Sequence, residues 1–275
     1  MHGTSFFCVI LIPVEFRIPS ILIPKGEQQC NICGVQTGLW LTRGHNNHAT
    51  QKYDIIGGKK RKVNCLNCGS SDRDRLLKHF FDDITPIGNL LHVAPEKALS
   101  RYFKGQSNLN ITKIDKKVGW YKLVYGYNVK YGDLTKLPFK DGCFDWVIAN
   151  HVLEHIKDEQ QAIYEIYRVL KQDGKAILQI PFSFKIKSTI EGEYNWTSTE
   201  RESQLGQKDH VRLYGLDFPN RWNLFHIQLY SLKDINDYER FNLNPQEPVI
   251  LVSKTTESKE LQHFKSIRFE KILKT

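Results

Sequence analysis

Two cysteine pairs are the residues whose spacing most directly indicates chemistry. Cys30 and Cys33 form one Cys-x-x-Cys pair, and Cys65 and Cys68 form the other. Each pair can place two thiolates on one tight turn, and two facing turns make a tetrahedral sulfur site suited to Zn²⁺. We predict that all four cysteines bind the ion, because paired turns of one kind close a symmetrical site. Such a site has no open position for substrate, so the zinc is expected to stabilise the fold.

Other residues between the pairs leave an alternative open. His45 and His48 have His-x-x-His spacing and could replace two of the thiolates, although an exposed loop is the favoured interpretation. The basic run KKRK, residues 59–62, could contact a phosphate-rich partner. A solvated loop is the favoured interpretation here too, so nucleic acid is possible as a partner but not favoured.

Length and composition limit the architecture. With 275 residues, 40% of them hydrophobic, the chain can form one sizeable core and a small second unit. The formal net charge of +9 does not by itself indicate nucleic acid. The six cysteines do not have the pattern of a secreted disulfide framework, so we predict a reducing, cytoplasmic location.

The apolar segment SFFCVILIPVEFRIPSILIP near the start is interrupted by Pro13, Glu15, Arg17 and Pro19. It falls short of the ~18 to 20 uninterrupted apolar residues that a membrane-spanning helix needs. A signal peptide is disfavoured because no basic cluster precedes the run and no small-x-small cleavage site follows it. We expect a poorly ordered arm or a segment packed on the domain; loose contact with a membrane or partner is the alternative.

Hydrophobic spacing then predicts alternating strands and helices. An amphipathic helix is expected to begin near Ser70, and the clearest helix runs from Asp158 to Lys171. Short apolar strands separated by helices indicate a parallel sheet covered on both faces. The predicted strands are 89–93, 110–115, 127–134, 144–150, 175–181, 225–232 and 247–254, with a further helix over 95–103.

These patterns divide the chain into four parts. The expected ranges are an arm (1–29), a cysteine-bearing unit (30–69), the main domain (70–254) and a charged tail or closing helix (255–275). No internal repeat is present in the sequence.

The segment from GDLTKLPF through FDWVIANHVLEHI and RVLKQDG to KAILQIP, residues 132–181, resembles class I S-adenosylmethionine-dependent methyltransferases of the type 11 kind. LLHVAPE, the cysteine pairs and LGQKDHVRLYG (205–215) extend the resemblance to a bacterial branch with an N-terminal zinc-ribbon-like unit. The resemblance implies an α/β fold with a Rossmann-like, mostly parallel seven-stranded sheet and helices on both faces. It also implies S-adenosylmethionine as cofactor and a methyl acceptor of unidentified class.

The resemblance assigns roles to residues at strand ends. Asp133 matches the acid that accepts the adenine amino group, with the backbone of Leu134 beside it. Asp115 falls where an acid holds the ribose hydroxyls, although it could also be part of a surface turn before Lys116 and Lys117. Open α/β sheets bind ligands outside the carboxyl ends of their strands, which favours the binding roles.

The loop LLHVAPEKALS, residues 90–100, contains no glycine where the family usually has two. Ala94 and Glu96 stand at those positions, and His92 replaces the usual acid. Pro95 is suited to be the first residue of the following helix. The Glu96 carboxylate could form an ion pair with the cofactor's ammonium group. The predicted cofactor residues are His92, Ala94, Pro95, Glu96, Asp115, Asp133, Leu134 and Asn150.

Three residues are predicted to act on the acceptor side. His151 follows the fourth strand, near the methyl group in the resembled fold, and Asp209 next to His210 could form a base and its orienter. For His155 a buried, structural role is favoured. The aromatic residues Tyr194, Trp196, Tyr214 and Trp222 could form a stacking wall, but core packing is the commoner outcome.

The leading prediction is therefore a methyltransferase with a structural zinc ion. The alternative is a non-catalytic zinc-containing module that binds nucleic acid or another partner on a methyltransferase-like scaffold. A nicotinamide-dependent oxidoreductase has little support because no Gly-x-Gly-x-x-Gly fingerprint follows a predicted strand.

Overall fold

The structure is a computed structural model and describes residues 18–118, 128–256 and 260–267. Most of the predicted N-terminal arm and the end of the chain, with Cys8, lie outside these ranges. Among the described residues, no helix has the length and apolar character needed to cross a bilayer.

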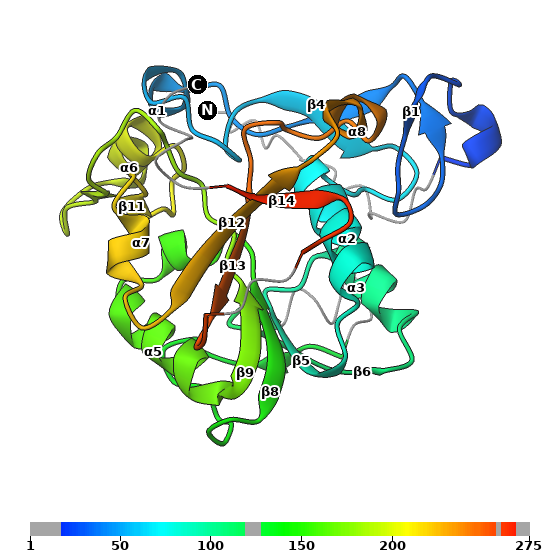
Figure 1. The fold of residues 1–275 in the computed structure, drawn as a ribbon. Coiled ribbons are helices and arrows are strands. Elements are labelled where there is room, and N and C mark those ends of the chain that lie inside the picture. Colours follow the sequence, from blue (N-terminus) through cyan, green and yellow to red (C-terminus); the bar gives the residue numbers. More distant parts are fainter. Residues whose placement is uncertain (1–17, 119–127, 257–259, 268–275) are drawn as a thin grey trace, which may run out of the picture.

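One large sheet forms the centre of the molecule (Figure 1). Five neighbouring strands are parallel, and three strands at one side are antiparallel. The eight strands in sheet order are β14 (Phe264–Ile267), β12 (His226–Leu232), β13 (Val249–Ser253), β9 (Leu170–Ile177), β8 (Phe144–Ala149), β5 (Gly88–Val93), β6 (Leu109–Asp115) and β7 (Lys130–Tyr131). The predicted Rossmann-like α/β fold is confirmed.

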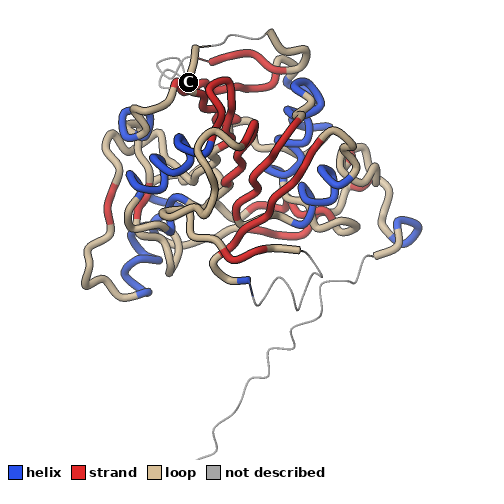
Figure 2. Tube along the Cα trace, turned by 90° about the horizontal axis from the view of Figure 1, so that it is seen from below, coloured by secondary structure: helices blue, strands red, loops and turns tan. Residues whose placement is uncertain are grey.

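Alternating side chains on the central strands divide the core into two layers. On β5, Leu91 packs with α5 (Glu159–Val169), whereas Leu90 packs with α2 (Asp72–Ile84) and α3 (Lys97–Lys104). Figure 2 shows the helices on both sides of the sheet. The period of two along a strand thus buries both faces, as a parallel sheet requires.

The helix predicted near Ser70 is present as α2, and its start has a local cause. Ser71 accepts a hydrogen bond from the backbone N–H of Asp74, while the Asp74 carboxylate accepts from the backbone N–H of Ser71. This reciprocal capping satisfies donors that the first helical turn leaves unpaired.

Two boundary predictions were wrong. The helix expected to reach Lys171 ends at Val169, because Leu170 is already extended and pairs with Phe144 of β8. Strand pairing therefore overrides the helical spacing. The expected tail contains β14, which pairs with β12 and makes the sheet eight-stranded instead of seven-stranded.

The cysteine-bearing unit consists of two small hairpins and one short helix. The hairpins join β1 (Gln28–Gln29) to β2 (Gln36–Thr37) and β3 (Trp40–Arg43) to β4 (Arg61–Cys65). The helix α1 (His48–Lys52) contacts α6 (Ser198–Leu205), which follows the parallel strands in the chain. The remaining elements are η1 (Ser20–Leu22), η2 (Leu153–His155), β10 (Ile190–Glu191), β11 (Arg212–Leu213), α7 (Phe218–Arg221) and α8 (Ile235–Arg240).

Arg75 of α2 joins this unit to the main domain. Its guanidinium is fully buried and lies over the Trp40 ring, 4.2 Å from the ring centroid. It donates to the carbonyl oxygens of Ser70, Phe241 and Asn242 at 2.8–2.9 Å. Three carbonyls from two separate segments thus depend on one cation.

Replacing Arg75 by Met should therefore destabilise the protein by about 3 kcal/mol, since hydrogen bonds to charged groups are lost and buried carbonyls are left unpaired. Denaturant unfolding followed by circular dichroism measures the change. The control is Arg240→Met, because Arg240 is exposed and its guanidinium lies over the Phe241 ring. It should cost less than about 1 kcal/mol. Equal losses in the two variants would contradict the role of Arg75.

Candidate cofactor site and cysteine cluster

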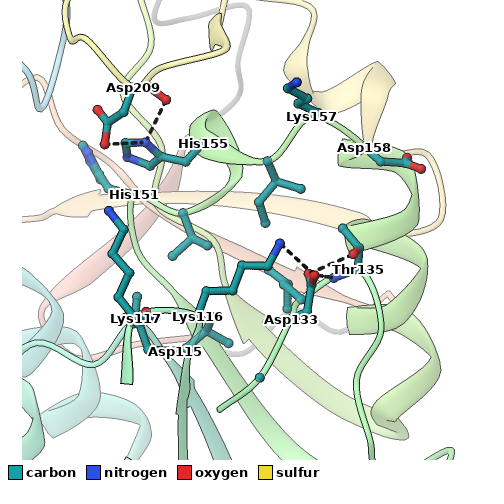
Figure 3. A pocket seen from close by; sticks show the side chains of 16 residues that line it. Asp115, Lys116, Lys117, Asp133, Thr135, His151, His155, Lys157, Asp158 and Asp209 are labelled. Atoms are coloured by element: carbon teal, nitrogen blue, oxygen red, sulfur yellow. Dashed lines mark hydrogen bonds and ion pairs between the residues drawn. The ribbon is translucent and has the colours of Figure 1, made fainter. Parts of the chain in front are cut away.

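A cavity of about 740 Å³ opens at the carboxyl ends of β5, β6 and β8 (Figure 3). Six predicted site residues line it: Ala94, Asp115, Asp133, Leu134, His151 and Asp209. Its volume lies within the range of about 300–1,000 Å³ that small-molecule sites occupy. The sequence did not single out Lys157 or Thr135, which also line the cavity, and it assigned His155, another lining residue, a structural role.

Two cavity residues leave their strands in a left-handed backbone conformation. Ala94 has φ +46° and His151 has φ +52°, and neither is glycine. The backbone N–H of Ala94 donates to the carbonyl oxygen of Ile114 in β6 at 2.8 Å, and that of His151 donates to the carbonyl oxygen of Gln179, just after β9, at 2.7 Å. This conformation costs a residue other than glycine roughly 1–2 kcal/mol. The glycine-free loop therefore adopts the backbone that a glycine would favour.

The two predicted acids lie on one side of the cavity. Asp133 accepts hydrogen bonds at Oδ1 from the backbone and hydroxyl of Thr135, and its Oδ2 lies 2.7 Å from Lys116 Nζ. Burial acts to raise the pKa of Asp133, but the hydrogen bonds from Lys116 and Thr135 hold it below the usual value. Asp115 accepts from the backbone N–H of Lys117 at 2.6 Å. Each carboxylate is therefore held in position by a hydrogen bond within a local turn that follows a strand.

His92 and Glu96 do not line the cavity. His92 is fully buried, and its Nε2 lies 2.7 Å from Glu96 Oε2. Burial acts to raise the pKa of Glu96, whereas the hydrogen bond with His92 lowers it. Neither side chain plugs the cleft. Pro95 and Asn150 are also absent from the lining, and Asn150 is only 5% exposed.

The acceptor-side histidines are arranged differently from the sequence prediction. Asp209 Oδ2 lies 3.3 Å from His155 Nδ1, so Asp209 pairs with His155 across the loop. His210 is 2% exposed, and its Nδ1 is bonded instead to the carbonyl oxygen of Leu205. The predicted pairing of Asp209 with His210 was therefore wrong, because adjacent residues here point to different neighbours.

His151 lines the cavity, and its two ring nitrogens have different surroundings. Nδ1 lies 3.3 Å from Glu154 Oε1, and Nε2 is buried. A Cβ added at Gly57 would come within 3.1 Å of this ring, so the cysteine-bearing unit packs directly on it. Burial, together with nearby Arg73 and Arg43, lowers the pKa of His151 well below its usual range.

Arg212, Tyr214 and Trp222 stabilise the fold around the cavity and do not line it. Arg212 donates to the carbonyl oxygens of Leu153, Ile156 and Lys157, which fixes the loop after β8. Tyr214 and Trp222 are fully buried in the core and donate to Glu159. Core packing is thus confirmed for these two aromatics, and no aromatic stacking wall is formed among the described cavity residues.

The four predicted zinc ligands come together. The sulfur atoms of Cys30 and Cys68 are 3.6 Å apart, and those of Cys33 and Cys65 are 3.7 Å apart. All four lie within 4.8 Å of one another. A tetrahedron with Zn–S bonds of about 2.3 Å has edges of roughly 3.8 Å, so the residues fit Zn²⁺. His45 and His48 are not in the cluster and are exposed.

The structure is a Rossmann-like domain with a cavity at the carboxyl ends of its strands, which is where open α/β sheets bind their ligands. Residues 98–178 match the family model described as a methyltransferase domain. The predicted resemblance to methyltransferases is therefore confirmed for this region.

Similar proteins share short segments with the chain. A demethylmenaquinone methyltransferase of Lactobacillus johnsonii is 43% identical over 61 residues, which is 22% of this chain and 25% of that protein. An uncharacterized methyltransferase, YcgJ, of Bacillus subtilis is 40% identical over 53 residues, covering 18% and 21%. The chain thus matches about a quarter or less of the length of these relatives.

Solved structures resemble the chain over about two thirds of its length. The YcgJ structure from Bacillus subtilis has 14% identity and a TM-score of 0.40, over 66% of this chain and 98% of that one. Phosphoethanolamine N-methyltransferase 2 of Haemonchus contortus, in complex with S-adenosyl-L-methionine, has 17% identity and a TM-score of 0.43, over 64% and 42%.

The left-handed turn predicts opposite effects for two alanines. Ala94→Gly should leave stability unchanged or raise it by up to about 1 kcal/mol, because relief of strain exceeds or balances the added chain entropy. Ala98→Gly, inside α3, should cost about 1 kcal/mol or more. Thermal unfolding of both variants measures the contrast, and an Ala94→Gly loss as large as that of Ala98→Gly would contradict the strained turn.

Proposed function

We propose that this protein transfers a methyl group from S-adenosylmethionine to an acceptor bound at the carboxyl edge of the sheet. The observation that carries the proposal is the open cavity with Asp115 and Asp133 at its wall. The matched family region, 98–178, includes both acids and His151.

The acids suit an adenosyl group because hydrogen bonds to ionised acceptors are stronger than neutral ones. Asp133 is proposed to accept from the adenine amino group and Asp115 from the ribose hydroxyls. Lys116 now holds Oδ2 of Asp133, but its side chain is 61% exposed. An exposed ion pair contributes about 0–1 kcal/mol, so Lys116 can move aside at small cost.

When bound, the cofactor supplies a methyl group already activated by its cationic sulfur. The protein then has to align the acceptor and exclude water. His151 and Asp209 remain the predicted acceptor-side residues that line the cavity, together with His155. Figure 3 shows these three on one side of the cavity and Asp133 with Lys116 on the other. We propose that the cofactor and the acceptor bind between these two walls.

We further propose that the cysteine cluster holds a structural Zn²⁺. All described cysteines are free, which favours a reducing location such as the cytoplasm. The names of several relatives make quinone C-methylation the first acceptor chemistry to test. The predicted acceptor-side residues Asp209 and His210 lie outside the matched family region, so this support is weaker than that for the cofactor.

The non-catalytic module has less support than the enzyme. Within KKRK, Lys59 pairs with Asp54 and Arg61 with Asp72, which reduces the charge free to meet phosphate. The Arg61–Asp72 contact is 2.7 Å long.

Calorimetric titration with S-adenosylhomocysteine tests the proposed cofactor site. Asp133→Asn should weaken binding at least about tenfold, because an amide N–H replaces the acceptor that faces the adenine amino group. Asp141→Asn is the matched control, since Asp141 is 80% exposed and lies outside the cavity lining. Lys116→Ala should change affinity by less than about threefold. Absence of binding in the unaltered protein, or equal affinity in both Asp variants, would contradict the proposal.

A further inference from the structure

Three side chains beside the cavity direct hydrogen-bond acceptor atoms toward one another. No hydrogen-bond donor of the described residues lies among these atoms. The three side chains are Glu154, His155 and His210, which come from η2 and the segment before β11. Each offers one ligand atom, and the three atoms lie within 4.8 Å of one another. This group, the Glu154 cluster, is separate from the four cysteines.

Hydrogen bonds on the far side of each imidazole fix where its free lone pair lies. His210 Nδ1 is 3.0 Å from the carbonyl oxygen of Leu205, which can only accept, so Nδ1 carries the proton. His155 Nδ1 faces the carbonyl oxygen of Asp209 at 3.2 Å and its carboxylate at 3.3 Å, and the same conclusion follows. In both rings the Nε2 lone pair is left for another partner.

The third member is a buried carboxylate without hydrogen bonds. Glu154 is fully buried, and neither of its oxygens has a hydrogen-bond partner among the described residues. His210 Nε2 is likewise buried without a partner. His151 Nδ1 lies 3.3 Å from Glu154 Oε1, yet it does not form a hydrogen bond with it. An unpaired buried acceptor costs about 1–3 kcal/mol, and more when it is charged. A positive ion bound to the Glu154 carboxylate and His210 Nε2 would remove this cost.

We propose that the Glu154 cluster binds a divalent transition-metal ion through one Glu154 oxygen and the Nε2 atoms of His155 and His210. Two imidazoles and one carboxylate form a ligand set that proteins use for catalytic zinc. The carbonyl of Leu205 and the carboxylate of Asp209 act as the outer partners that orient such histidines.

Binding an ion requires the three ligand atoms to move closer together. Glu154 Oε1 and His155 Nε2 are 3.9 Å apart, whereas two ligands on a tetrahedral ion at about 2.0–2.1 Å are roughly 3.4 Å apart. The widest ligand pair must close by up to roughly 1.4 Å on the same basis. The His155 side chain is 32% exposed and borders the cavity, so an ion can enter from there.

The proposed ion would present an open coordination position to the acceptor side of the cavity. An oxygen-bearing acceptor, or water, could occupy that position, and the ion would polarise it. Metal binding itself does not depend on the proposed methyl transfer and can be measured without cofactor. The rival arrangement is a proton on Glu154, since burial raises the pKa of this carboxyl to about 7.

Metal analysis of the full chain tests the proposal. After incubation with excess ZnCl₂ and gel filtration, the unaltered protein should retain about two zinc ions per chain, one at each site. Glu154→Gln keeps the side-chain volume but lowers the ligand charge, and it should weaken the second site at least about tenfold. The control His263→Asn alters a histidine paired with Asp83, outside the cluster, and should retain both ions.

Cobalt reconstitution identifies which site is filled. The four-cysteine site gives thiolate-to-cobalt charge-transfer absorption, which the nitrogen and oxygen ligands of the second site do not give. Glu154→Gln should keep this absorption and lose only the additional visible bands, which also shows that the variant folds. A single cobalt ion bound through thiolates in the unaltered protein, or unchanged second-site binding in both Glu154→Gln and His210→Asn, would overturn the proposal.

Discussion

The site depends on two left-handed residues that end adjacent strands. Ala94 after β5 and His151 after β8 have positive φ, while their N–H groups donate to Ile114 of β6 and to Gln179 just after β9. The left-handed backbone conformation costs each of these two residues roughly 1–2 kcal/mol. Such strain persists only where the surrounding packing determines it, and here it opens the cavity at the strand ends.

The cysteine-bearing unit supports this edge of the sheet. Arg75 joins it to the main domain through Ser70 and the segment after α8, and Gly57 packs against the His151 ring. Gly57 has φ +77°, and any side chain there would meet that ring. A zinc ion that holds the small unit in shape would therefore also hold one wall of the cavity.

Much of the fold could be predicted because its signals are local. The two cysteine pairs, the Ser71 start of α2 and the apolar strands required only short-range patterns, and the structure contains each of them. The end of α5 and the strand β14 could not be predicted, since both depend on pairing with distant strands. Asp115 and Asp133, to which the family resemblance assigned binding roles, both line the cavity. The pairing of Asp209 with His155 could not be predicted, because it depends on how two distant segments fold together. Adjacency in the sequence indicated His210 instead.

The most direct test of the account is a crystal structure with S-adenosylhomocysteine. The account predicts the adenosyl group between the ends of β5 and β6, with the adenine amino group on Asp133, the ribose on Asp115 and the sulfur facing the side of His151 and His155. Ala94 should keep its positive φ beside the ligand. A ligand bound elsewhere, or a cavity that stays empty in crystals soaked at saturating concentration, would contradict it.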